Sequence, residues 1–296
     1  MAFNTDKFRG TGVAMITPFS ADGEIDFRRL EEHTDRLIGN GIDYLVILGT
    51  TAETPTLSKE ERREVVRCIT DSAAGRVPLV IGIGGNNTKA VIEEIRETDL
   101  DRAMALLSVA PYYNKPNQDG LYQHFSAIAS VAELPLIIYN IPGRTGVNVN
   151  TDTLLRLAAD FPEQIIGVKE ASGDLMQIME IIRQRPEGFR VISGDDGVAF
   201  PVVACGGDGV ISVAGNALPG VVSEMIRAAL NGQMEKARSI HYKVLPLIPL
   251  LFKEGNPAGV KALMEIFGMI DNNLRLPLIP ASKKLYDDIA AMSSLF

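Results

Sequence analysis

Lys169 is the residue of this sequence whose type and position most directly suggest chemistry. It stands near the end of "IIGVKEASGD", where the first four residues are apolar or glycine and predict a buried strand. If neighbours such as Val168 desolvate its side chain, the pKa of the amine falls. A neutral amine can then attack a carbonyl carbon and form a Schiff base. The alternative is a strand-end lysine whose ammonium group reaches solvent.

Tyr139, Thr50 and Thr51 also stand at the ends of apolar runs. Tyr139 is near the end of "PLIIYNIP", and its phenol could carry protons to and from a carbinolamine oxygen beside Lys169. Thr50 and Thr51 follow "LVILG", where hydroxyl and backbone N–H groups could hold a carboxylate or relay a proton. The alternatives are an amphipathic core tyrosine and hydroxyls that cap a helix or a turn.

Arg144 is a cation in position to bind an anionic substrate. It follows Tyr139 in "PGRTG", and the chain has a net charge of −8, so an anionic substrate needs a local cation. A guanidinium binds a carboxylate through two parallel hydrogen bonds. The alternative is a solvated loop. Asp195 and Asp196, in "SGDDGVAF", are adjacent carboxylates that we expect to cap the following helix.

Tyr112 and Tyr113 are neighbours in "APYYNKP", a predicted strand-end loop. Side chains of adjacent residues in such a loop point in different directions. We therefore expect at most one of the two rings to face the site and the other to pack at an interface.

Eight short apolar runs predict how these residues come together. They begin roughly 20–35 residues apart, the length of a strand and a helix, and lack the alternation of half-exposed strands. This pattern predicts an α/β fold, a (β/α)8 TIM barrel, in which residues that follow the strands gather at one face. An open doubly wound sheet is the alternative, although no G-x-G-x-x-G follows the first run. The runs are "TGVAMITPF", "DYLVILGT", "PLVIGIG", "AMALLSVAP", "PLIIYNIP", "IIGVKEAS", "RVISGDD" and "GVISVAGN".

Helix signals fill the gaps between these runs. Ser58 and Glu61 form a capping box for a helix that we expect to close at Gly75, and Thr151 opens another before Pro162. After about Leu230 the strands cease, and the remaining segments predict two or three helices. The sequence thus predicts a barrel catalytic domain over residues 1–230 and a C-terminal helical domain over residues 231–296.

Composition and charge exclude several classes of protein. The chain has 296 residues, of which 46% are hydrophobic and 22% charged, so it should fold around a large core. Its acidic balance argues against nucleic acid and membrane as partners. The absence of a signal-peptide pattern or membrane-length apolar run predicts a cytoplasmic location. Scattered histidines and two distant cysteines, Cys68 and Cys205, predict no metal site and two reduced core thiols.

The motifs together resemble the dihydrodipicolinate synthase family of pyruvate-dependent class I aldolases. The resemblance rests on "GTTAETPTLS", "PYYNKPNQDGLYQHF", "IIYNIPGRTG", "GVKEASGD", "SGDD" and "GVISVAGN", in the family's order over nearly the whole chain. It implies an enzyme that condenses pyruvate with L-aspartate 4-semialdehyde in the diaminopimelate route to lysine. It further implies a homotetramer, a dimer of dimers, and no cofactor besides a covalent pyruvate Schiff base.

The resemblance also implies the catalytic roles. Lys169 would form the Schiff base with pyruvate, and the resulting enamine would add to the aldehyde. Thr50, Tyr113 and Tyr139 match the family's proton-relay triad. In such enzymes the tyrosine that matches Tyr113 is donated across a tight dimer interface, so a complete site would need two subunits.

Four further positions match residues that contact the substrates in the family. Thr51 matches a residue that binds the pyruvate carboxylate, and Arg144 matches the residue that binds the carboxylate of the semialdehyde. Gly194 and Ile211 match main-chain positions beside the catalytic lysine.

The chain departs from the family's usual pattern at two places. Ala52 stands where the family usually has glycine, which we expect to be tolerated unless φ is positive there. Asn86 and Tyr112 match positions of the family's allosteric site. However, Arg62 and Ala90 stand where lysine-inhibited members tend to carry histidine and glutamate.

Two other functions are weighed against the synthase. A sibling aldolase, such as an N-acetylneuraminate lyase or a 2-keto-3-deoxy sugar acid aldolase, shares the barrel and the lysine. The "YYNKP" motif and Arg144 favour the synthase, because a short substrate carboxylate needs that clamp. A non-catalytic binding or regulatory homologue would have lost Lys169 or Tyr139, and both are present.

We predict that lysine inhibits this enzyme poorly. Arg62 and Ala90 add a cation and remove a carboxylate at positions of the family's allosteric site, and both changes disfavour a cationic ligand. Initial rates measured against increasing lysine should stay near the uninhibited value. Strong inhibition in the low millimolar range or below would contradict the prediction.

Overall fold

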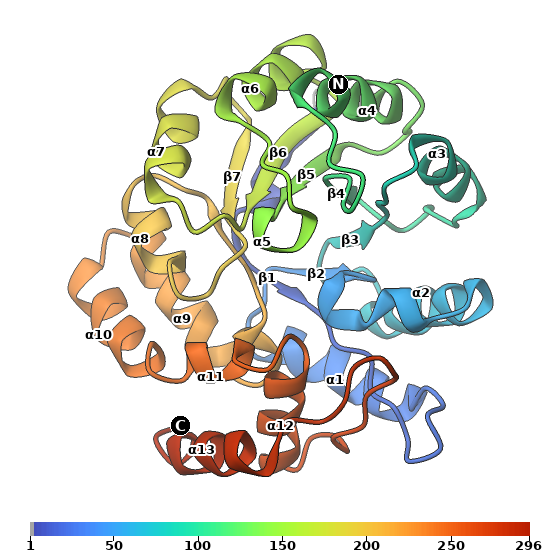
Figure 1. The fold of residues 1–296 in the computed structure, drawn as a ribbon. Coiled ribbons are helices and arrows are strands. Elements are labelled where there is room, and N and C mark those ends of the chain that lie inside the picture. The colour runs from blue at the N-terminus through green and yellow to red at the C-terminus, as the bar shows by residue number, and fades with distance from the viewer. Residues whose placement is uncertain (1–2) are drawn as a thin grey trace.

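The computed structural model describes residues 3–296 and contains a closed barrel of eight parallel strands. Each strand pairs with its neighbours in sequence, and β1 pairs with β8 to close the barrel (Figure 1). The predicted (β/α)8 barrel is therefore confirmed. The strands are β1 (Gly10–Ala14), β2 (Tyr44–Ile47), β3 (Leu79–Gly82), β4 (Ala105–Val109), β5 (Leu136–Asn140), β6 (Ile165–Glu170), β7 (Arg190–Ser193) and β8 (Gly209–Ser212).

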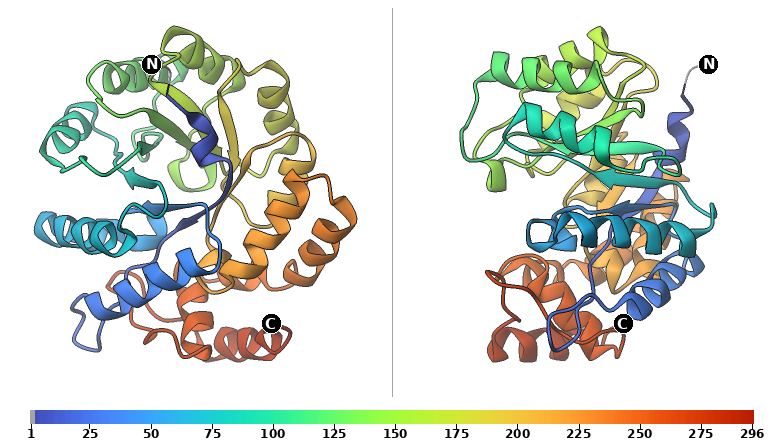
Figure 2. Two further views of the ribbon diagram at one scale, coloured as in Figure 1. Left: turned by 180° about the vertical axis from the view of Figure 1, so that it is seen from behind. Right: turned by 90° about the vertical axis from the view of Figure 1, so that its right-hand side faces the viewer.

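Helices surround the barrel and connect its strands (Figures 1 and 2). The loop after β5 carries a short extra helix before the connecting one. The helices as far as the end of the last βα unit are α1 (Phe27–Gly39), α2 (Lys59–Ala73), α3 (Thr88–Glu97), α4 (Gln118–Ala129), α5 (Pro142–Thr145), α6 (Thr151–Asp160), α7 (Leu175–Gln184), α8 (Ala199–Ala204) and α9 (Pro219–Leu230).

The strands are buried on both faces, which explains why their sequences do not alternate. In β5, Leu136 and Ile138 belong to the apolar cluster shared with the surrounding helices, whereas Ile137 and Tyr139 belong to the cluster inside the barrel. Phe8, in the short 3-10 helix η1 (Thr5–Phe8) before β1, fills the N-terminal end of that inner cluster. The barrel is therefore closed below, and its C-terminal mouth is left for function.

The predicted helix starts are observed. The Ser58 hydroxyl accepts the N–H of Glu61 at 3.1 Å, and the Glu61 carboxylate accepts the N–H of Ser58 at 2.8 Å, so the capping box forms. The helix α2 ends at Ala73, just before the predicted Gly75. Helix α6 begins at Thr151, as expected.

The C-terminal segment forms four helices rather than two or three. They are α10 (Met234–Val244), α11 (Ile248–Phe252), α12 (Ala258–Ile266) and α13 (Lys283–Ser293). The chain divides into α10 and α11 because Pro246 between them lacks the N–H that would continue one helix. Val210 of β8 shares an apolar cluster with Leu251 and Leu263, so these helices pack against the barrel. The division into two domains stays a prediction.

Two features outside the barrel bear on the other expectations. Cys68 and Cys205 are free thiols, but Cys205 is exposed, so its expected place in the core is wrong. It follows the last residue of α8, where the chain turns out to the surface. Within residues 3–296, no helix has both the length and the apolar character needed to cross a bilayer.

Candidate active site

Lys169 and Tyr139 lie opposite each other on neighbouring strands at the barrel mouth. Their Cα atoms are register partners in the β5–β6 pair. The Lys169 Nζ atom lies 4.3 Å from the centroid of the Tyr139 ring. Lys169 is 4% exposed and Tyr139 6%. The Lys169 side chain is therefore buried and does not reach solvent, contrary to the alternative considered from the sequence.

Burial lowers the pKa of the Lys169 amine to about 7. The Asp196 carboxylate opposes this shift, and the Arg144 guanidinium adds to it. An unperturbed lysine titrates near pH ~10.4 and is almost wholly cationic at neutral pH. Here a large fraction of the amine is neutral at pH 7, and this is the form that attacks a carbonyl carbon.

The Asp196 carboxylate binds the end of β8 and does not cap a helix, so that expectation is wrong. One of its oxygens accepts a hydrogen bond from the Ser212 hydroxyl, and the other accepts the N–H groups of Val213 and Ala214 at 2.9 and 3.0 Å. These N–H groups lie beyond the strand ladder and need an acceptor when buried. Asp195 instead closes a short turn with the N–H two residues ahead.

The Tyr139 phenol is kept protonated by its surroundings. Burial raises its pKa to about 12, although Arg144 and a hydrogen bond with the Thr50 side chain work in the opposite direction. A protonated phenol that touches a hydroxyl can give a proton in one step and recover it in another. The structure thus brings together Lys169, Tyr139 and Thr50.

Thr50 and Thr51 lie in a 3-10 turn, η2 (Thr50–Ala52), which follows β2. Thr51 is 2% exposed, and its hydroxyl oxygen accepts a hydrogen bond from the side-chain amide of Asn256 at 2.9 Å. Ala52 lies inside this turn, and the positive φ of 55° falls on the next residue, Glu53. Alanine in place of the usual glycine is therefore accommodated.

Gly194 gives the lysine the space that it occupies. A Cβ atom at this position would lie 2.7 Å from Cβ of Ala171 and 3.0 Å from Cε of Lys169, closer than unbonded carbon atoms approach. Ile211 lies on β8 and is fully buried in the inner cluster with Tyr139. A side chain at position 194 would thus collide with the stem of Lys169, whereas Ile211 shares an apolar cluster with Tyr139.

Arg144 lies on α5 above the barrel mouth, where its side chain is exposed. Its charge nevertheless acts on the pKa values of both Lys169 and Tyr139. A cation that is exposed yet acts on buried groups stands where an anionic substrate would enter.

Two buried residues beside the site were not predicted from the sequence. The Asn140 side-chain amide donates to the Glu170 carboxylate at 2.9 Å, and its oxygen accepts the N–H of Val149 at 3.0 Å. These bonds tie the loop that carries Arg144 to the ends of β5 and β6. The sequence feature that could have identified Asn140 and Glu170 is their position, because they directly follow the site residues Tyr139 and Lys169.

The structure of one chain leaves Tyr113 apart from the other predicted catalytic residues. Its side chain is 88% exposed, and its φ of 72° is unusual for a bulky residue. Tyr112 is 42% exposed on the same loop. Exposed aromatic rings on a strained loop are typical of a surface that binds another protein chain.

The positions that match the family's allosteric site lie near α2 and α3. Arg62 forms an ion pair with Glu94 at 2.8 Å, and it also donates to the Thr54 carbonyl at 3.1 Å. Arg62 and Ala90 line a groove of about 900 Å³ between the two helices. Asn86 is half-buried, and its carbonyl accepts the side-chain amide of Asn114 at 2.8 Å.

A closed barrel with a desolvated lysine at its mouth is typical of barrel enzymes that use a lysine amine as the nucleophile. Among residues 3–296, no group of three or more histidine, cysteine, aspartate or glutamate side chains could hold a metal ion. The chain belongs to the dihydrodipicolinate synthetase family, whose model matches residues 7–294. The family expected from the sequence is thus confirmed.

Similar proteins of known name cover almost the whole chain. A 4-hydroxy-tetrahydrodipicolinate synthase of Azobacteroides pseudotrichonymphae is 51% identical over 97% of both chains. The synthase of Parabacteroides distasonis is 49% identical over 96% of this chain and 95% of that one. The crystal structure of dihydrodipicolinate synthase from Aquifex aeolicus is 41% identical, covers 97% of each chain and superposes with a TM-score of 0.93.

We predict that Lys169 reacts as an amine of pKa near 7. Competitive labelling with an amine reagent across a pH series, read by mass spectrometry, should give Lys169 a midpoint near 7. The variant Arg144→Gln should move the Lys169 midpoint upward, because it removes a nearby positive charge. A wild-type midpoint for Lys169 at the ~10.4 of an unperturbed lysine would contradict the prediction.

Proposed function

We propose that the protein condenses pyruvate with L-aspartate 4-semialdehyde to give 4-hydroxy-tetrahydrodipicolinate. The observation that carries the proposal is the buried amine of Lys169 against the ring of Tyr139, at 4.3 Å from its centroid. Support comes from relatives at 51% and 49% identity that carry the name of this synthase. The sibling aldolases considered from the sequence share the lysine, but the relatives reported above do not bear their names.

The first half of the reaction uses the neutral amine. Nζ of Lys169 attacks C2 of pyruvate, and the phenol of Tyr139 gives its proton to the oxygen of the resulting carbinolamine. A second proton, released by Nζ and passed on by Tyr139, lets this oxygen leave as water, and an iminium ion forms between C2 and Nζ. The iminium withdraws electrons from C3, which loses a proton and becomes the nucleophilic carbon of an enamine. Thr50, in hydrogen-bond contact with Tyr139, relays the protons.

The second half joins the two substrates and frees the lysine. C3 of the enamine attacks the aldehyde carbon, and the aldehyde oxygen takes up a proton to become the hydroxyl of the product. The amino group of the semialdehyde then attacks C2 of the restored iminium. This attack closes the ring, and expulsion of the Lys169 amine from C2 then releases the cyclic imine and returns the enzyme to its starting state. No cofactor is required, because the iminium serves as the electron sink.

The two carboxylates of the substrates have separate partners. The Thr51 hydroxyl lies in the turn beside the site and binds the pyruvate carboxylate. Arg144 lies exposed at the mouth and pairs with the carboxylate of the semialdehyde, which enters second. Gly194 borders the stem of Lys169, Ile211 shares the inner cluster with Tyr139, and we infer that both limit the space around the bound pyruvate.

The proposal includes a partner subunit. Tyr113 is 88% exposed, and the proposal places its ring in the site of a neighbouring copy, where it completes the proton relay with Thr50 and Tyr139. The assembly is a homotetramer built from two such dimers. The enzyme acts in the cytoplasm, in the synthesis of lysine through diaminopimelate.

The activity is tested by a coupled assay. Pyruvate and aspartate semialdehyde are supplied with dihydrodipicolinate reductase, and the loss of NADPH is followed. Lys169→Ala should lower kcat by about 10³-fold or more, because it removes the amine that forms the iminium. Lys284→Ala, which removes an exposed lysine of α13, serves as the control.

Trapping the intermediate gives a second readout of the same prediction. Borohydride with pyruvate should add the mass of a reduced pyruvate adduct to wild type and none to Lys169→Ala. A folded wild type without turnover, or an active Lys169→Ala variant, would refute the proposed function.

The shared site is tested by mixing inactive subunits. Lys169→Ala and Tyr113→Phe should each have low activity when alone. In a dimer that contains one subunit of each variant, one of the two sites is complete. It combines Lys169 of the Tyr113→Phe subunit with Tyr113 of the Lys169→Ala subunit. Random mixing in equal amounts should restore about a quarter of the wild-type activity per subunit, since half the dimers are mixed and have one good site of two. Mixed dimers that form without any recovery would contradict the exchange of Tyr113.

A further inference from the structure

The turn that carries Thr50 and Thr51 ends on a residue in an unfavourable backbone conformation. Glu53 has φ 55° and ψ 32°, the left-handed region, and it separates η2 from the next 3-10 turn, η3 (Thr54–Thr56). Its N–H closes the turn on the Thr50 carbonyl at 3.2 Å. A non-glycine residue in this region is destabilised and persists only when its surroundings hold it.

The side chain of Glu53 is held by the C-terminal helices. Its carboxylate lies 2.6 Å from the amine of Lys261 on α12, and both side chains are fully buried. The second oxygen accepts the N–H of Arg275 at 3.1 Å, and Lys261 also donates to the carbonyl of Asn273 at 2.8 Å. Both charges thus have partners, which a buried ion pair requires. The pair joins the turn after β2 to a helix more than 200 residues later.

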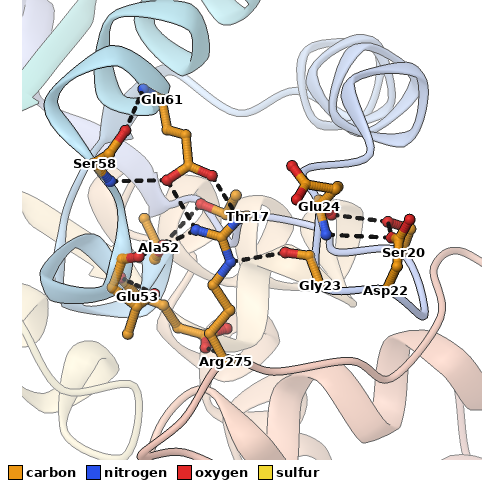
Figure 3. A network of polar contacts seen from close by, with 11 residues as sticks. Thr17, Ser20, Asp22, Gly23, Glu24, Ala52, Glu53, Ser58, Glu61 and Arg275 are labelled. Carbon is orange, nitrogen blue, oxygen red and sulfur yellow. Dashed lines mark hydrogen bonds and ion pairs between the residues drawn. The ribbon is translucent and has the colours of Figure 1, made fainter.

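Arg275 extends the same support to the outer side of the turn. Its guanidinium binds the Glu61 carboxylate at 2.5 and 2.9 Å and the Gly23 carbonyl at 2.8 Å (Figure 3). The hydroxyl of Thr17, which follows β1, donates to the Ala52 carbonyl at 2.8 Å. The turn is therefore fixed from three directions before any substrate binds.

Asn256 makes the contact that reaches the site itself. It lies just before α12 and is 6% exposed, and its side-chain amide donates to the hydroxyl oxygen of Thr51 at 2.9 Å. Its own carbonyl oxygen is buried and finds no partner among residues 3–296. A half-satisfied buried amide costs stability. An asparagine here is thus not explained by stability alone, and within residues 3–296 its side chain makes one hydrogen bond, the bond to Thr51.

This bond fixes the direction of the Thr51 proton. A hydroxyl has one proton to donate and lone pairs that accept. Because the oxygen accepts from Asn256, the proton is free to point to another acceptor. Thr51 donates no hydrogen bond within residues 3–296. A substrate carboxylate carries only acceptors, so it matches a hydroxyl that is set to donate.

We propose that Asn256, supported by the Lys261–Glu53 ion pair, is a positioning residue that directs the Thr51 hydroxyl proton to the carboxylate of pyruvate. This inference rests on the proposed function, since it names pyruvate as the ligand of Thr51. The C-terminal helices thereby take part in substrate binding at the barrel mouth without touching the substrate.

The test compares Asn256→Ala and Asn256→Asp in the coupled assay. Asn256→Ala should raise the KM for pyruvate about tenfold, with kcat and the KM for the semialdehyde nearly unchanged. Asn256→Asp has almost the same shape but accepts instead of donating. It takes the Thr51 proton and repels the carboxylate, so it should raise the KM for pyruvate further. A role in packing alone would leave Asn256→Asp close to wild type.

A double-mutant cycle shows whether Asn256 acts through Thr51. Thr51→Val should raise the KM for pyruvate, and Asn256→Ala added to it should change that KM no further. Ser282→Ala is the matched control, because it removes a hydrogen-bonding side chain of the C-terminal segment that bonds Glu254 and not the turn. It should lower the melting temperature and leave the KM for pyruvate unchanged.

The outcomes separate this inference from the proposed function. Wild type without turnover of pyruvate would refute the function. Active wild type, with an unchanged KM for pyruvate in folded Asn256→Asp or with independent effects in the cycle, would overturn the positioning role alone. Binding of pyruvate, measured by the pyruvate dependence of borohydride trapping, should follow the same order as KM.

Discussion

Burial of the Lys169 amine at the barrel mouth is the constraint on which the site depends. A lysine that is 4% exposed would be costly as a cation, and its pKa falls to about 7. The strand register sets Tyr139 opposite it, and the missing side chain at Gly194 leaves room for its stem. Asp196 lies near enough to moderate the shift and is itself satisfied by the end of β8. All of these contacts form together, because closure of the barrel brings the ends of β5, β6, β7 and β8 to one mouth.

Two buried polar networks hold the loops around this amine. On one side, Asn140 and Glu170 secure the loop that carries Arg144. On the other, Glu53 and Lys261 secure the turn that carries Thr50 and Thr51. Both networks lie behind the site, so they fix loop geometry without competing for substrate. Groups that bind a small, charged ligand gain from such preorganisation, because little conformational freedom is lost on binding.

The sequence predicted the parts of the structure that follow from local pattern. The eight apolar runs became the eight strands, and the polar residues after them gathered at one face because parallel strands end together. For this reason the sequence predicted that Lys169, Tyr139 and Thr50 lie at the same face of the barrel. The Ser58–Glu61 capping box is equally local, and it was predicted for the same reason.

Local sequence pattern gave wrong predictions, or none, for residues whose place in the structure depends on contacts with distant parts of the chain. Asp196 follows a strand, a position at which an aspartate commonly caps the next helix. Its carboxylate instead accepts the N–H groups of Val213 and Ala214 after β8. Asn256 and Lys261 could not be assigned to the site, because their partners Thr51 and Glu53 lie 205 and 208 residues away. Cys205 is an apolar residue type at the end of an apolar helix, and only the path of the chain there exposes it.

The separation between Glu53 and Lys261 also has a consequence for synthesis of the chain. The turn around Thr51 is synthesised early, whereas the helix that neutralises Glu53 is synthesised only when about nine-tenths of the chain has been made. Until then, the carboxylate has no buried partner and the Glu53 backbone has little to hold its left-handed conformation. A nascent chain therefore acquires its pyruvate-binding turn as one of the last events of folding, after all eight strands are available.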